Sequence, residues 1–200
     1  MANLITLARF VLLFVLVASA LQTPSHWQLL NAPLLIFIIA LDGLDGYVAR
    51  RRGETSAFGS VFDIVVDRIV ENVTWIVLAH LQLVPLWVVL LFITRGVIVD
   101  SIRAIAIREG ETPFGMMQGR WGRAIVSSRA SRALYGGVKI LCFGWLFFFQ
   151  PWPALFPNLW ISWQNDVNLV SQAFIFATVV MCVIRALPVV VEYLRSEEHT

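Results

Sequence analysis

The sequence predicts an all-α integral membrane protein, with six transmembrane helices and a polar site that faces the cytoplasm. Of its 200 residues, 58% are hydrophobic and 14% are charged, whereas soluble domains contain about 45–50% apolar and about 25% charged residues. The apolar residues also form long runs, and roughly 20 such residues cross a bilayer as a helix. We therefore expect a single membrane domain over residues 1–200, and neither a soluble globular protein nor a disordered chain.

Apolar runs locate the six helices. They are expected at Leu4–Leu21, Gln28–Ala49, Phe58–Leu81, Pro85–Ile107, Ala133–Phe149 and Val167–Leu194. The first run is interpreted as a transmembrane helix and not as a signal peptide, because no convincing small-residue cleavage site follows it. Two of the connections are long: Arg108–Arg132 is rich in Arg and Gly, and Gln150–Asp166 is rich in Pro and Trp.

The basic residues predict the orientation. The loops after the first, third and fifth helices contain no Lys or Arg, whereas those after the second and fourth contain Arg51, Arg52, Arg108, Arg120, Arg123 and Arg129. Positively charged loops remain in the cytoplasm. We therefore expect a multi-pass protein of the cell (inner) membrane, with both termini and the polar site on the cytoplasmic side and with membrane lipids around it.

Four aspartates interrupt the apolar pattern where the second helix ends and the third begins. Asp42 and Asp45 are three residues apart, and Asp63 and Asp67 are four apart, so each pair shares one helix face. A carboxylate inside a membrane helix costs about 2.5–3.5 kcal/mol on insertion scales and indicates a functional site. The turn Arg51–Ala57 is short, so the two helices are antiparallel neighbours and the four carboxylates are expected to converge.

Converging carboxylates predict a metal site. Without a counter-charge they would repel one another, and oxygen ligands without His or Cys suit Mg²⁺ or Mn²⁺. Four carboxylates are enough to bridge two divalent cations about 3.5–4 Å apart, an arrangement used for displacement at phosphorus. The two cysteines, Cys142 and Cys182, lie in apolar runs, where we expect them to pack between helices.

The same residues resemble a known family. The pattern is Asp42-x-x-Asp45-Gly46-x-x-Ala49-Arg50, then eight residues, then Gly59-x-x-x-Asp63-x-x-x-Asp67, and it matches the signature of the CDP-alcohol phosphotransferases at every defined position. The opening segment Asn3-x-x-Thr6-x-x-Arg9 also resembles that family. The resemblance implies a two-metal enzyme that transfers the phosphatidyl group of a CDP-lipid such as CDP-diacylglycerol to an alcohol and releases CMP. It also suggests a homodimer.

The resemblance assigns roles to individual residues. Asp42, Asp45 and Asp63 would be metal ligands, and Asp67 would be a ligand or the general base. Residues lining the CDP-lipid pocket would be Gly46, Ala49 and Gly59, with Arg50 on the diphosphate and, at its border, Asn3 and Thr6. For Asn3 and Thr6, capping of the first helix is an equally good interpretation. Glu71, one turn beyond Asp67, is expected to be a structural partner of Arg68 or of a neighbouring helix.

Surplus positive charge on the cytoplasmic side suits a phosphorylated acceptor. The candidate residues are Arg95, Arg103, Arg120, Arg123, Arg129, Arg132 and Lys139. Guanidinium groups bind phosphate in a charge-assisted, often bidentate manner, although each of these residues is explained equally well as a topology signal. Glycerol 3-phosphate is the first choice, inositol phosphate the nearest alternative, and serine or choline would need less positive charge.

A cation-coupled transporter and a membrane scaffold are the alternatives to an enzyme. Transporter sites usually lie at mid-bilayer between inverted repeats, but these acids lie at helix ends and the sequence shows no repeat. A scaffold does not account for four acids on two facing stripes. No nucleic-acid partner is expected.

Overall fold

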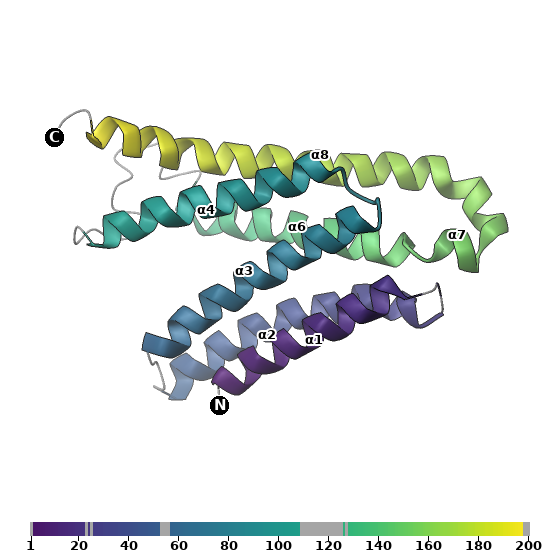
Figure 1. The fold of residues 1–200 in the computed structure, drawn as a ribbon, viewed down its shortest axis with the longest axis horizontal. Helices are drawn as coiled ribbons and strands as arrows, with labels where there is room; N and C mark the ends of the chain where they lie inside the picture. The colour runs from purple at the N-terminus through teal and green to yellow at the C-terminus, as the bar shows by residue number, and fades with distance from the viewer. Residues whose placement is uncertain are drawn as a thin grey trace. The chain divides into compact units, whose positions relative to one another are not determined.

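The structure is a computed structural model that describes residues 2–22, 24, 26–52, 57–108, 126 and 128–197. Its elements are α1 (Ala2–Leu21), η1 (His26–Leu30), α2 (Asn31–Arg52), α3 (Ala57–His80), α4 (Leu86–Arg108), α6 (Arg129–Phe149), α7 (Trp152–Leu155) and α8 (Pro157–Glu197) (Figure 1). No strand occurs among the described residues. The predicted all-α class is therefore confirmed.

The prediction was wrong at the start of the last helix. The sequence places a Pro- and Trp-rich connection at Gln150–Asp166, but α7 and the first residues of α8 occupy most of that segment. Pro157 is the first residue of α8, a position where the missing N–H of proline leaves no helical hydrogen bond unmade. The prolines of this segment therefore begin helices and do not prevent them.

Within the part of the chain that the structure describes, four segments are long and apolar enough to cross a membrane: Leu4–Leu21, His26–Leu44, Ala130–Leu155 and Pro157–Arg195. Length and composition thus support a membrane protein. The helices α3 and α4 are not among the four, and each carries four charged residues. In α3 these charges include the predicted site acids, so the residues that would do chemistry also lower the hydropathy of the helix that holds them.

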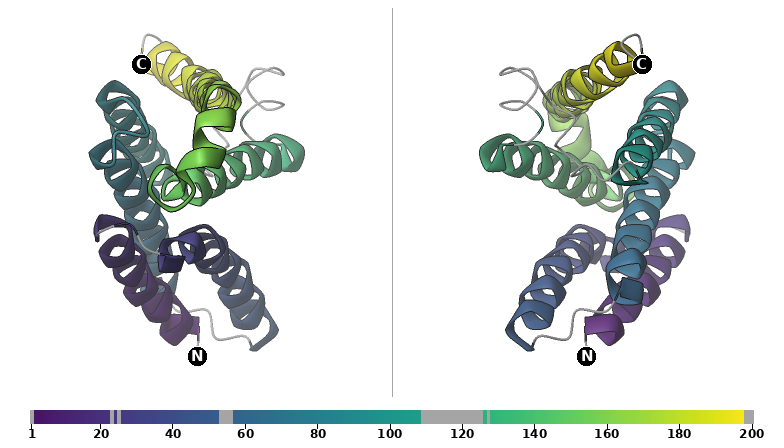
Figure 2. Two further views of the ribbon diagram at one scale, coloured as in Figure 1. Left: turned by 90° about the vertical axis from the view of Figure 1, so that its right-hand side faces the viewer. Right: turned by 90° about the vertical axis from the view of Figure 1, so that its left-hand side faces the viewer.

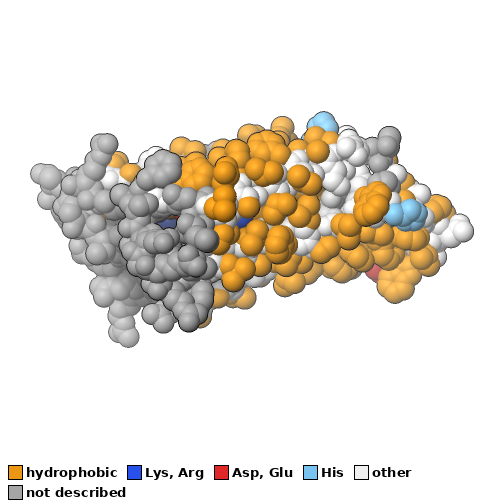
Figure 3. Space-filling model, turned by 90° about the horizontal axis from the view of Figure 1, so that it is seen from below, with side chains coloured by type: hydrophobic (Ala, Val, Ile, Leu, Met, Phe, Trp, Pro, Cys, Tyr) orange, Lys and Arg blue, Asp and Glu red, His pale blue; other side chains and the backbone are white. Residues whose placement is uncertain are grey.

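Large apolar side chains stay exposed on the outer faces of the helices. On α1, Leu7, Val11 and Phe14 are about half exposed, and they follow the three- to four-residue spacing of one helix face. Hydrophobic side chains dominate the described surface on the side where α1 and α2 lie (Figure 3). So large an exposed apolar surface is typical of a protein that contacts lipid or another protein.

The chain folds into two compact units. The first comprises Met1–Pro85 and Cys142–Ser171. Within it α1 packs against both α2 and α3 (Figure 2), around buried residues such as Leu13, Leu35 and Trp75. The ring of Trp75 meets that of Phe143 edge-on, with centroids 4.6 Å apart.

The buried side chain of Gln28 stabilises the turn between α1 and α2. Its Nε2 donates to the carbonyl oxygens of Ser19 at 3.0 Å and Gln22 at 3.1 Å, which satisfies acceptors that the end of α1 would leave open. The chain then reverses into α2. Arg9 lies about as far before the end of α1 as Asp42 lies after the start of α2. The two residues therefore lie at about the same height along the paired helices.

The second unit comprises Leu86–Leu141 and Gln172–Thr200. It contains α4, the first part of α6 and the second part of α8. Its core includes the buried residues Val99, Ile102, Val126 and Val189. Cys142 in the first unit and Cys182 in the second are both buried and form no disulfide, which is consistent with the predicted packing role.

Candidate functional site

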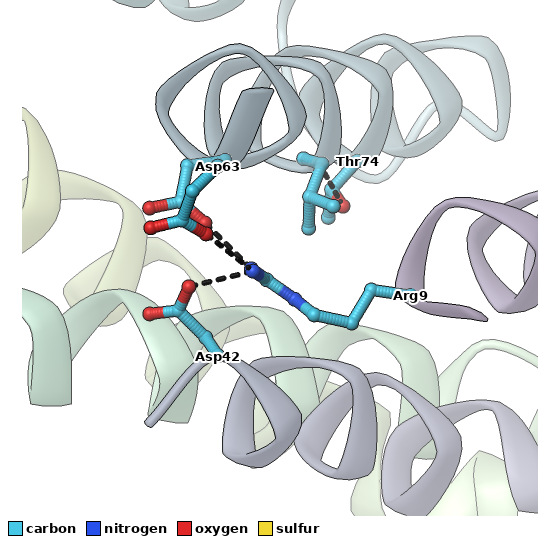
Figure 4. A network of polar contacts seen from close by, with 6 residues as sticks. Arg9, Asp42, Asp63 and Thr74 are labelled. Carbon is cyan, nitrogen blue, oxygen red and sulfur yellow. Dashed lines mark hydrogen bonds and ion pairs between the residues drawn. The ribbon is translucent and has the colours of Figure 1, made fainter. Parts of the chain in front are cut away.

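Three of the four predicted acids converge. Asp42 of α2 and Asp63 and Asp67 of α3 each offer a carboxylate oxygen, and these oxygens all lie within 4.8 Å of one another. The spacing within α3 places Asp63 and Asp67 on one face, one turn apart. Figure 4 shows Asp42 and Asp63 reaching toward the same point from neighbouring helices. The predicted convergence is confirmed for these three residues.

A buried arginine lies at the point of convergence. The Nη1 of Arg9 is 2.6 Å from Oδ1 of Asp42 and donates to Oδ1 of Asp63 at 3.2 Å. Its Nη2 donates to Oδ1 of Asp67 at 2.5 Å. The side chain comes from α1 (Figure 4) and is only 2% exposed. One guanidinium therefore bonds carboxylates from two other helices.

The donor set fits hard divalent cations. Three carboxylates outnumber the single guanidinium, so these four side chains keep a net negative charge. The acids are 38–47% exposed, which leaves them accessible to ions and substrate. Each carboxylate has two oxygens and about four lone-pair positions, and Mg²⁺ and Mn²⁺ bind through such oxygens.

The other signature residues are described only in part. Asp45, Gly46, Ala49 and Arg50 lie in the helical backbone of α2, but their side chains fall outside the described residues, as does that of Asn3. Asp45 follows Asp42 by three residues in the same helix. Gly59 lies in the first turn of α3, one turn before Asp63.

Thr6 and Glu71 complete this region. Thr6 is 3% exposed and lies one turn before Arg9. Because α1 begins at Ala2, Thr6 is inside the helix, so the capping interpretation was wrong for this residue. Arg68 Nη1 donates to Glu71 Oε2 at 3.4 Å, which confirms Glu71 as a structural partner of Arg68.

A second polar cluster lies in the other unit. Three cations surround the buried ring of Tyr135: Lys139 Nζ lies 4.5 Å from its centroid, Arg185 Cζ 5.4 Å and Arg95 Cζ 5.8 Å. They come from α6, α8 and α4. A cation over an aromatic face is stabilised by the ring quadrupole, but three like charges around one ring also repel one another. Guanidinium and ammonium groups gathered at one ring are chemically suited to bind a phosphate.

Arg185 is the most deeply buried member of the cluster, at 6% exposure. Its Nη1 donates to Oγ of Ser131 at 2.6 Å and its Nη2 to the carbonyl oxygen of Val126 at 3.3 Å. These bonds fix the guanidinium on α8 against α6. A cation that is fixed in position loses less conformational entropy when it binds a phosphate.

The predicted acceptor residues lie at different places in the structure. Arg95 and Lys139 belong to the Tyr135 cluster. Arg103 on α4 is half-buried and Arg132 on α6 is exposed. Arg120 and Arg123 lie outside the described residues, as does the side chain of Arg129.

The sequence prediction missed two functional candidates, Arg9 and Arg185. The opening pattern Asn3-x-x-Thr6-x-x-Arg9 contains Arg9 without giving it a role, and Arg185 lies outside every motif of the sequence. Both are arginines within long apolar helices. A basic residue in such a helix is rare and indicates a site in the same way as an intramembrane acid, so this signal was available for both.

Comparison with known proteins finds a matching family and several relatives. A family model described as CDP-alcohol phosphatidyltransferase matches residues 1–184. The CDP-diacylglycerol–glycerol-3-phosphate 3-phosphatidyltransferase of Bacillus subtilis (strain 168) is 29% identical, over 76% of this chain and 95% of that protein. An enzyme of the same name from Pseudomonas fluorescens is 32% identical, over 56% of this chain and 59% of its own length. A probable phosphatidylglycerophosphate synthase of Mycobacterium tuberculosis (strain H37Rv) is 31% identical, over 56% of each.

Proposed function

The chain belongs to the CDP-alcohol phosphatidyltransferase family, and from this premise we propose that it transfers the phosphatidyl group of CDP-diacylglycerol to glycerol 3-phosphate and releases CMP. The observation that carries the proposal is the convergence of Asp42, Asp63 and Asp67, three acids of the family signature, within 4.8 Å. The acceptor follows from the names of the relatives and from the cation cluster around Tyr135.

The four signature acids would hold two divalent cations, Mg²⁺ or Mn²⁺. Asp42, Asp45 and Asp63 act as ligands, and Asp67 acts as a ligand or as the base. The bound ions would neutralise the diphosphate and the developing charge on the leaving phosphate. The exposed fractions of the described acids support this assignment, because a charged diphosphate must reach them from water.

The chain's own residues bind the substrate and move the proton. The acceptor hydroxyl oxygen forms a bond to the lipid-bearing phosphorus, the bond from that phosphorus to the CMP oxygen breaks, and Asp67 takes the hydroxyl proton. Arg50 binds the diphosphate, and Gly46, Ala49 and Gly59 line the cytidine pocket. Asn3 and Thr6 border the same pocket.

The acceptor phosphate is bound by the Tyr135 cluster. Arg95, Lys139 and Arg185 supply three positive charges around one ring, which suits a dianionic phosphate better than an uncharged alcohol. Because these cations recognise phosphate and not the polyol, inositol phosphate is the second candidate acceptor. The remaining basic residues assigned to the acceptor are Arg103, Arg120, Arg123, Arg129 and Arg132.

The reaction is tested with purified protein, CDP-diacylglycerol and Mg²⁺ in detergent, with CMP release measured for each acceptor. We expect rapid release with glycerol 3-phosphate, slower release with inositol phosphate, and little with serine or choline. If CMP is released with serine but with neither phosphorylated acceptor, the acceptor assignment is contradicted. The reaction class would still hold. An absence of CMP release with every acceptor would contradict the enzyme and favour the cation transporter.

The Tyr135 cluster makes a separate prediction for acceptor binding. Lys139→Gln and Arg95→Gln should each raise the KM for glycerol 3-phosphate roughly 10–100-fold, because a hydrogen bond to a charged group contributes about 1.5–3 kcal/mol. The KM for CDP-diacylglycerol should change less than about twofold. Arg195→Gln is the matched control, since Arg195 is an exposed cation in the last turn of α8. Equal increases in both KM values would contradict the assignment.

We also propose that the chain crosses the cell membrane six times, with both termini and the acid cluster on the cytoplasmic side. Residues 1–200 form one domain, and two copies of the chain form a homodimer. The loops that lack Lys and Arg support this orientation, and the family model over residues 1–184 supports a single domain.

Cysteine labelling tests the orientation. A membrane-impermeant maleimide should modify Asn158→Cys in intact cells and should modify Ser56→Cys only after the membrane is opened. Asn158 is exposed, and the native Cys142 and Cys182 are buried, so the background is low. Modification of Ser56→Cys alone in intact cells would show the opposite orientation.

A further inference from the structure

Arg9 occupies the position in the acid cluster where a bound cation would neutralise charge. Its guanidinium contacts one oxygen each of Asp42, Asp63 and Asp67, at 2.5–3.2 Å. Those oxygens belong to the same three carboxylates that could hold a metal ion. The side chain is 2% exposed while the acids are 38–47% exposed. The cation therefore approaches the acids from inside the protein.

The contacts of the Arg9 guanidinium indicate a role beyond helix packing. A planar guanidinium group can donate to several carboxylates at once through its two terminal nitrogens. Here the guanidinium of Arg9 links α1 to both helices that carry the acids. Without a positive charge between them, three carboxylates within 4.8 Å would repel one another in a partly buried setting, where charges are poorly screened.

We propose that Arg9 is an internal counter-ion of the metal site, which holds Asp42, Asp63 and Asp67 together when no metal is bound and competes with the metal for their charge. This inference rests on the proposed metal site. Arg9 is thus a positioning residue: it acts on the reaction through the carboxylates and touches neither substrate nor the reacting phosphorus.

The proposal makes two predictions with opposite signs. Removing the charge of Arg9 should destabilise the metal-free protein, because the carboxylates lose their counter-charge. It should also tighten metal binding, because the incoming divalent ion meets a more negative site and displaces no competitor. A residue that only packs would lower stability equally with and without metal, and its loss would leave metal affinity unchanged or weaker.

The experiment compares full-length wild type with Arg9→Gln and Arg9→Lys, purified in detergent and freed of metal with EDTA. The dissociation constant of Mn²⁺ is measured by electron paramagnetic resonance of the free ion, and Tm is measured with and without saturating Mn²⁺. For Arg9→Gln we expect the Kd of Mn²⁺ to fall about tenfold or more, equivalent to about 1.4 kcal/mol. We also expect a larger Mn²⁺-induced rise in Tm than in wild type.

Comparison with Arg9→Lys and with one further variant separates the effect of charge from that of folding. Arg9→Lys keeps the charge without the planar guanidinium, so its Mn²⁺ affinity should lie between those of wild type and Arg9→Gln, and its metal-induced rise in Tm should exceed that of wild type. If Arg9→Gln does not fold, Arg9→Lys decides the question. Arg185→Gln removes another buried arginine, 6% exposed, and should leave Mn²⁺ affinity unchanged.

The outcomes distinguish this inference from the proposed function. An unchanged or weaker Mn²⁺ affinity in both Arg9 variants, with normal binding to wild type, would overturn the counter-ion alone. An equal loss of Tm with and without Mn²⁺ would do the same. Failure of wild type to bind Mn²⁺ would overturn the metal site and the counter-ion with it.

Discussion

Asparagine in place of Asp42 or Asp63 is expected to reduce phosphatidyl transfer by roughly 10²–10³-fold or more, the range seen when one preorganised electrostatic contact is removed from an active site. The amide keeps the size of the side chain and one oxygen, but it removes the negative charge that a divalent cation requires. CMP release from CDP-diacylglycerol with glycerol 3-phosphate measures the effect. EDTA should abolish the activity of the wild type, and added Mg²⁺ or Mn²⁺ should restore it.

A matched control separates this loss from damage to the fold. Asp166 is an exposed aspartate of the same unit, on α8, and Asp166→Asn should keep wild-type turnover. The Tm of Asp42→Asn in EDTA should stay at or above that of the wild type, since one fewer carboxylate must share the charge of Arg9. Undiminished transfer in a rigorously metal-free preparation would overturn the two-metal mechanism.

Asp67→Asn is expected to lower kcat by about 10²–10⁴-fold, the usual value of general-base assistance, with little change in the KM for CDP-diacylglycerol. Asp67 is 47% exposed and accepts a hydrogen bond from Arg9 Nη2. The Asp67 carboxylate is therefore accessible to an acceptor from solvent, and the buried Arg9 side chain fixes its orientation. Steady-state kinetics in both substrates give kcat and KM separately.

The comparison with Asp63→Asn decides which role Asp67 has. If Asp67 is the base, its variant should bind Mn²⁺ nearly as tightly as wild type, whereas Asp63→Asn should bind it more weakly. Parallel losses of Mn²⁺ affinity and of kcat would assign Asp67 as a ligand instead. A near-native kcat in Asp67→Asn would exclude both roles.

The amino-acid sequence alone was enough to predict the all-α class and the convergence of Asp42, Asp63 and Asp67. Local spacing carries this information, because residues three or four apart share a helix face whatever the rest of the chain does. Asp63 and Asp67 are one turn apart, and only four residues separate α2 from α3. So short a connection favours antiparallel helices, which brings Asp42 near the other two acids. The same reasoning failed at Gln150–Asp166, because a proline marks a helix start as readily as a break, and composition alone does not distinguish the two.

The tertiary structure alone decided which side chains from distant helices meet. Arg9 lies 54 and 58 residues before the acids to which it donates, Asp63 and Asp67, and Arg185 lies 54 residues after its partner Ser131. No spacing rule reaches across such separations, because the contact depends on which faces of the helices pack together. In apolar helices many faces are equally hydrophobic, so the pattern of residues does not select one, and the choice is made by packing and by the pairing of buried charges.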